Sequence, residues 1–219
     1  MTNLFSVFDP SMSFMNMNWT STMIGLMLMP TMYWILPSRN TMLFMIMTEK
    51  LHKELKVLMK NYKGSFLMLI SMFMFIMLNN MMGLLPYVFT SSSHLSFTMS
   101  LALPMWLSLM IFGWTKKTKK MFYHLIPIGT PNILMPFMVC IETVSNLIRP
   151  GSLAVRLTAN MIAGHLLMSL LGNMTINMNN IVILMMIMTQ LMLMMFEMAV
   201  SIIQAYVFTV LSTLYSSEM

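Results

Sequence analysis

Long apolar segments alternate with short polar ones along this chain. The apolar segments run approximately over residues 14–36, 65–89, 97–114, 132–171 and 181–215. A hydrocarbon core about 30 Å thick is crossed by roughly 20 helical residues, so each segment is long enough to span a membrane. The pattern predicts an all-α integral membrane protein with five membrane-crossing helices. No composition shift or repeat divides residues 1–219, which we expect to form a single membrane domain.

Residues 41–63 follow a different pattern. Apolar side chains recur there at spacings of three and four residues, while one Glu and several Lys occupy the other faces. This periodicity predicts an amphipathic helix that lies at the membrane surface instead of crossing the membrane. The apolar positions are Phe44, Met47, Leu51, Leu55, Leu58 and Tyr62.

Composition and charge agree with a membrane protein. Of the 219 residues, 58% are hydrophobic and 8% charged, whereas a soluble domain carries about 25% charged residues. Ten of the twelve Lys and Arg residues lie at 39–63 and 116–120, beside apolar spans, which argues against nucleic-acid binding. By the positive-inside rule, these loops and the C-terminus face the inner side of the membrane and the N-terminus faces the outer side.

The last two apolar segments are longer than a membrane requires. As one helix, residues 132–171 would extend about 60 Å at 1.5 Å per residue. Either the helix breaks at Pro150–Gly151, or it tilts well beyond the usual ~20°. We expect residues 132–171 and 181–215 to form a long, strongly tilted hairpin.

Charged side chains lie inside these two segments. A charge at the centre of a bilayer costs at least about 2.5–3.5 kcal/mol, so such residues commonly mark ion pathways or paired sites. At 100° per residue, one face of the fourth segment carries a polar stripe. The stripe comprises Glu142, Ser145, Arg149, Ser152, Arg156 and Asn160.

Two further groups complete the candidate site. His165 projects to the side opposite Arg156, and Glu197 shares a face of the last segment with Ser201 and Gln204. A structural alternative stays open for several of these residues, because Glu142 could pair with Arg149 and His165 could serve as a helix–helix contact. Glu197 has no basic neighbour in its own segment and is the strongest candidate for a proton relay.

The remaining residues with reactive side chains give weaker evidence of function. The sequence contains no phosphate-binding glycine loop, no dinucleotide fingerprint and no recognisable metal-ligand spacing, so no cofactor, metal or nucleotide is predicted. Cys140 is expected to be a buried thiol, and His94 to be solvated in a serine-rich turn.

Several runs resemble subunit a of the mitochondrial F-type ATP synthases. The resemblance lies in Ala154–Leu167, Gln204–Thr209, Asn80–Phe89 and Ile141–Thr143. It implies that Arg156 faces a rotating c-ring, holds the ring carboxylate ionised and separates two half-channels. It implies that His165 and Glu197 line the half-channel open to the intermembrane space. Glu142 would belong to the matrix-side half-channel, and Asn160 and Gln204 would be polar neighbours of the arginine.

The resemblance also implies partners and a location. The partners are the c-ring of proteolipid subunits, the peripheral stalk, small accessory membrane subunits and lipid, with no nucleotide or nucleic acid bound by this chain. The chain would be a proton-channel subunit with no catalysis of its own. It would lie in the mitochondrial inner membrane, with its N-terminus toward the intermembrane space and its C-terminus toward the matrix. The 36 methionines suit an AT-rich mitochondrial genome.

One position departs from the family pattern. Arg149 stands where some members carry a neutral polar residue, and it receives no essential role.

Two rival function classes remain: a proton-coupled transporter or antiporter-like respiratory subunit, and a purely structural membrane subunit. The first would normally show repeated halves, and none are visible in the sequence. The second leaves the polar stripe unexplained.

Overall fold

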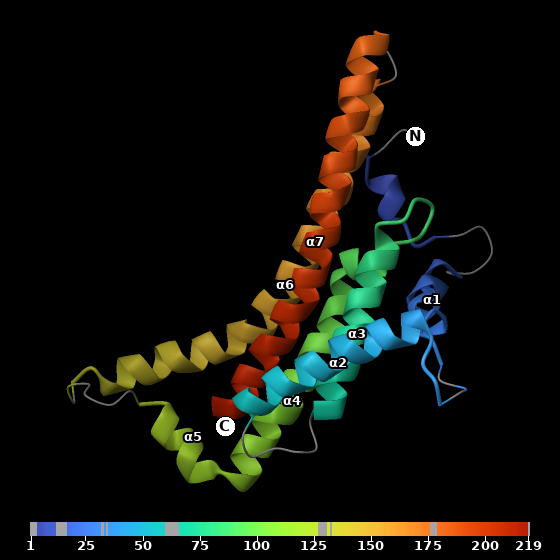
Figure 1. Cartoon of the computed structure of the whole chain (residues 1–219). Coiled ribbons are helices and arrows are strands. Elements are labelled where there is room, and N and C mark those ends of the chain that lie inside the picture. Colours follow the sequence, from blue (N-terminus) through green and yellow to red (C-terminus); the bar gives the residue numbers. More distant parts are fainter. Residues whose placement is uncertain are drawn as a thin grey trace.

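The computed structural model describes residues 4–11, 17–31, 33, 35–59, 66–126, 131, 133–175 and 179–218. The regular structure within these ranges is helical (Figure 1). Its α-helices are α1 (Ser21–Met27), α2 (Arg39–Leu58), α3 (Phe66–Gly83), α4 (Leu95–Lys116), α5 (Thr118–His124), α6 (Met135–Met174) and α7 (Asn180–Glu218). Three short 3-10 helices are η1 (Leu4–Phe8), η2 (Met17–Thr20) and η3 (Ser91–Ser93).

Four helices in the described ranges are long and apolar enough to cross a membrane. These are α3, α4, α6 and α7, and they coincide with the last four predicted spans. α3 ends at Gly83, earlier than the predicted residue 89, because Pro86 cannot continue a helix. The prediction of an all-helical membrane protein is therefore confirmed for this part of the chain.

The first predicted span, residues 14–36, takes a different form. Within it α1 contains seven residues, and the helix ends at Met27, shortly before Pro30. Proline disfavours the α conformation in the residue that precedes it, which explains the early end. Residues 12–16, 32 and 34 lie outside the described ranges. The described part of this segment contains no helix of spanning length.

The predicted amphipathic helix is present as α2. Ser38 caps its N-terminus, with the side-chain oxygen accepting from the backbone N–H of Thr41. Leu51 and Leu55 are buried, since α2 packs on α3 and α7. The apolar face is thus covered in part by α3 and α7. Tyr62 lies outside the described residues.

α6 runs without interruption through Pro150, so the first of the two alternatives for its length, a break at Pro150–Gly151, is absent. Instead, Figure 1 shows α6 bent along its length. A proline inside a helix removes one backbone donor and pushes its ring against the preceding turn, which bends the axis. The N-terminal half of α6 stands away from the bundle in the same view. Cys140, predicted to be buried, is exposed on this half.

The packing of the long helices sets the geometry of the site. α3 packs along α7, α4 packs along α6, and α6 meets α7. Near their connection, α6 and α7 lie side by side at one end of the molecule (Figure 1). The α3–α4 connection and the N-terminal turn η1 lie toward the same end. α5 and the end of α7 lie toward the opposite end. Ile76, Leu157 and Phe208 form part of the core between these helices.

A polar cavity between the spanning helices

A cavity of about 350 Å³ lies where α6, α7 and the end of α3 meet. Its walls are mostly apolar, as the membrane setting requires, with leucine, methionine and phenylalanine side chains. A few polar side chains converge on it from the three helices. They are Asn80, Asn160, Glu197, Ser201 and Gln204. A cavity of this size with several polar partners has room for water.

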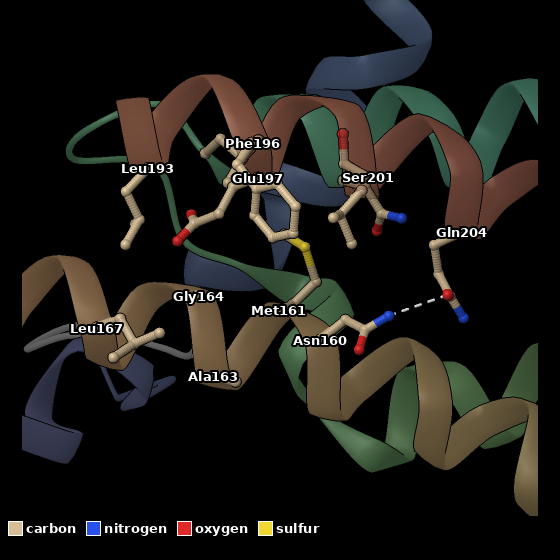
Figure 2. A pocket seen from close by; sticks show the side chains of 13 residues that line it. Asn160, Met161, Ala163, Gly164, Leu167, Leu193, Phe196, Glu197, Ser201 and Gln204 are labelled. Atoms are coloured by element: carbon tan, nitrogen blue, oxygen red, sulfur yellow. Dashed lines mark hydrogen bonds between the residues drawn. The ribbon is translucent and has the colours of Figure 1, made fainter. Parts of the chain in front are cut away.

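Glu197 is the charged group of this cavity. Figure 2 shows its side chain reaching from α7 toward Gly164 of α6. The side chain is 9% exposed, and neither carboxylate oxygen has a hydrogen-bond partner within the described ranges. A buried carboxylate without a protein partner is costly unless it binds a proton or water. The site therefore suits reversible protonation.

Gly164 makes this position of the carboxylate possible. A Cβ atom built on Gly164 would lie 2.7 Å from Cδ of Glu197, which is closer than real Cβ contacts allow. Glycine at this position lets the acid approach the backbone of α6 directly. Glu197 and Gly164 therefore act as a matched pair across the α6–α7 interface.

An amide pair closes one end of the cavity. Nδ2 of Asn160 donates to Oε1 of Gln204 at 3.0 Å, which links α6 to α7 (Figure 2). Ser201 is buried between Glu197 and Gln204 along α7. The predicted grouping of Glu197, Ser201 and Gln204 on one helix face is thus present in the structure.

Asn80 is a cavity residue that the sequence did not place in the candidate site. Its side chain is completely buried near the end of α3, and its Oδ1 and Nδ2 atoms have no partner within the described ranges. The signal available in the sequence is an amide inside an apolar span. The convergence of α3 on the α6–α7 cavity could not be deduced from spacing alone.

His165 lies outside the walls of this cavity. Its ring makes a hydrogen bond with the backbone of Gly83, the last residue of α3, where helix carbonyls lack helical partners. The ring of Phe8 packs edge-on against it, with 6.2 Å between ring centroids. Nε2 is buried without a partner among the described residues. His165 thus packs at the helix–helix contact that its structural alternative predicts.

Arg156 is exposed on α6, although it sits in the middle of a membrane-spanning helix. No hydrogen bond or ion pair to it is found within the described ranges. It precedes Asn160 by one turn, or about 6 Å along the axis, so it lies next to the amide-closed end of the cavity. An exposed cation in an apolar helix favours an anionic partner outside this chain.

Glu142 and Arg149 lie together at a distance from this cavity. Oε1 of Glu142 is 3.6 Å from an Nη atom of Arg149, and the guanidinium stands 5.0 Å from the ring centroid of Tyr215. About a quarter of each charged side chain is exposed. The ion pair predicted by the structural alternative is therefore present. In the described ranges no three His, Cys, Asp or Glu side chains gather as metal ligands would.

The fold and site define a class: a helical membrane protein whose spanning helices line an acid-containing cavity beside an exposed arginine. Residues 12–217 match the family described as ATP synthase A chain. The chain is 57% identical to ATP synthase subunit a of Drosophila melanogaster, 56% to that of Locusta migratoria and 58% to that of Anopheles gambiae. Each comparison covers 100% of this chain and 99% of the relative. The chain belongs to the ATP synthase subunit a family.

Proposed function

We propose that this chain is the proton-conducting stator subunit in the membrane sector of the mitochondrial ATP synthase. Two offset aqueous half-channels load and unload protons on the carboxylates of a c-ring and so drive its rotation. The observation that carries the proposal is the exposed Arg156, one helical turn from a cavity that holds the buried acid Glu197. The family's name supports membership in the synthase complex.

The entry route begins at the intermembrane side. A proton passes His165 and Glu197 and reaches a ring carboxylate near Arg156. The neutralised carboxylate can then travel through lipid, which its charged form could cross only at high cost. Asn160 and Gln204, joined by their hydrogen bond, close the cavity on the side of Arg156.

Arg156 separates the two routes. Its guanidinium stays charged at any accessible pH, so it favours the ionised form of an approaching carboxylate. A proton arriving from either side therefore meets a fixed positive charge instead of a continuous water path. Direct leakage is suppressed, and protons must travel with the rotor.

The exit route passes Glu142 on the matrix side. This acid is partly exposed, which supports a role in taking a proton from the ring and passing it to water. Each proton that crosses 100 mV supplies about 2.3 kcal/mol, and several protons are needed for each ATP. Catalysis itself belongs to other subunits, since this sequence carries no nucleotide-binding motif.

The proposal includes the membrane arrangement. The chain lies in the mitochondrial inner membrane with five crossings, the first within residues 14–36. Its N-terminus is toward the intermembrane space and its C-terminus toward the matrix, and α6 and α7 form a tilted hairpin against the ring. The basic segments at 39–63 and 116–120 support this orientation. Besides the ring, the partners are the peripheral stalk, accessory membrane subunits and lipid.

Cross-linking from α6 tests the proposed contact with the ring. In a Cys140→Ser background, Ala159→Cys places a thiol on the exposed residue between Arg156 and Asn160. We expect oxidation to link this position to a proteolipid subunit carrying a thiol beside its own carboxylate. Ile111→Cys, 62% exposed on α4, is the matched control and should give no such product. Absence of the α6 product in an assembled complex would favour the transporter alternative.

A second prediction concerns the glycine beside the buried acid. Gly164→Ala adds a Cβ atom into the space occupied by the Glu197 carboxylate, so the acid must move away from α6. We expect proton-driven ATP synthesis to fall about tenfold, since misplacing a proton-transfer group by about 1 Å can cost this much or more. ATP synthesis per assembled complex is the measurement. Gly151→Ala is the control, because nothing lies within 4 Å of a Cβ atom there; equal losses in both variants would contradict the proposed role of this contact.

A further inference from the structure

The N-terminal turn η1 rests on α6 at His165. Among residues 4–8, Phe8 is the one that is half-buried, whereas Leu4, Phe5 and Val7 are exposed. The rings of Phe8 and His165 meet at 89°, with centroids 6.2 Å apart. Edge-to-face aromatic pairs favour this perpendicular arrangement. The contact joins the beginning of the chain to a residue of the proposed entry route more than 150 positions away.

The His165 ring is held from two sides. The backbone of Gly83 makes a hydrogen bond with it, and Phe8 packs against it. These contacts limit the orientations of the imidazole and leave Nε2 without a partner among the described residues. A ring that must pass on a proton needs this kind of fixed orientation, since the direction of its exchanging nitrogen decides which group it can reach.

The segment that carries Phe8 is anchored a second time. The ring of Trp19, in η2, lies 5.7 Å from Phe89 and 5.3 Å from His94. His94 is therefore packed among aromatic rings and not solvated as the sequence suggested. Nδ2 of Asn18 also donates to the backbone carbonyl of Asp9 at 3.4 Å. The two aromatic contacts tie Trp19 to the bundle, whereas the hydrogen bond joins Asn18 to Asp9 within the N-terminal part of the chain.

We propose that Phe8 is a positioning residue for His165, and that η1 (Leu4–Phe8) is a strap holding the outer end of the entry route in its conducting geometry. This inference rests on the proposed role of His165 in proton entry. Phe8 does not exchange protons itself. It acts by keeping the imidazole in the orientation from which a proton moves inward.

Phe8→Ala tests this role. An edge-to-face contact is worth about a two- to tenfold preference for one ring orientation. We therefore expect proton flux per assembled complex, measured in membranes carrying the variant, to fall by about this factor. Phe8→Tyr keeps the ring and should restore the flux. Phe5→Ala removes a ring that is 68% exposed and should change nothing. An unchanged flux in Phe8→Ala would overturn the inference.

A comparison of double variants distinguishes whether Phe8 positions the His165 ring or only stabilises the fold. If Phe8 acts through His165, Phe8→Ala has no further effect in a His165→Gln background. If the same loss recurs there, the strap supports the fold only, and the inference is wrong. A normal flux in His165→Gln alone would instead remove His165 from the entry route. Where Phe8→Ala lowers assembly, Phe8→Leu fills the space without an aromatic ring and should show the same loss of flux.

Discussion

Mitochondrial membranes carrying Arg156→Ala are expected to lose ATP synthesis by about a hundredfold or more. In the proposed function, the guanidinium is the fixed charge that keeps a ring carboxylate ionised at the boundary between the two routes. One or two lost kilocalories per mole at this step already cost roughly a factor of ten, and the loss of the charge also opens a direct path between the routes. The measurement is respiration-driven ATP synthesis per assembled complex.

Arg149 provides the matched control for this prediction. It lies two turns from Arg156 on the same helix and carries the same charge, but it is paired with Glu142 and Tyr215. Arg149→Gln should retain most of the ATP synthesis. Equal losses in the two variants would show that both positive charges on α6 are needed, and the special role of Arg156 would be wrong.

Glu197→Gln is expected to reduce both ATP synthesis and passive proton flux by about a hundredfold, which is within the usual contribution of a proton-transfer group. The amide has nearly the same shape as the acid, so the packing against Gly164 survives. What is lost is the ability to bind and release a proton. ATP synthesis and flux are measured in the same membrane preparation.

Glu49→Gln gives the comparison for this loss. Glu49 is exposed on α2, outside the cavity, and its neutralisation should leave both activities unchanged. Normal proton flux in Glu197→Gln would mean that protons bypass the cavity. In that case the buried carboxylate would serve packing or assembly only.

Periodicity and charge placement in the sequence were sufficient for most of the helices. The bounds of α2, α6 and α7 agree with the predicted segments to within a few residues, because each has either a strong apolar run or a strict three-and-four spacing. The face shared by Glu197, Ser201 and Gln204 followed from helix geometry alone. The ion pair of Glu142 and Arg149 was one of two alternatives that spacing allowed.

Other features depend on contacts that no local pattern encodes. The cavity exists because α3 brings Asn80 to the α6–α7 interface, and the packing of Gly164 on Glu197 joins positions on two helices. α6 is bent, and Cys140 on its N-terminal half is exposed, whereas its apolar neighbours suggested burial. Near the N-terminus, hydropathy predicted one long span, but α1 stops ahead of Pro30. Tertiary packing and proline stereochemistry decide these points.

Passive proton conductance in variants of Arg156 measures whether this arginine keeps two proton routes apart. We propose that the two routes meet at this arginine and that the outer one passes Glu197. Arg156→Ala should therefore make the membrane leak protons, and adding Glu197→Gln should abolish that leak by closing the outer route. A membrane that stays proton-tight in Arg156→Ala would contradict the account, and so would a leak that Glu197→Gln leaves unchanged.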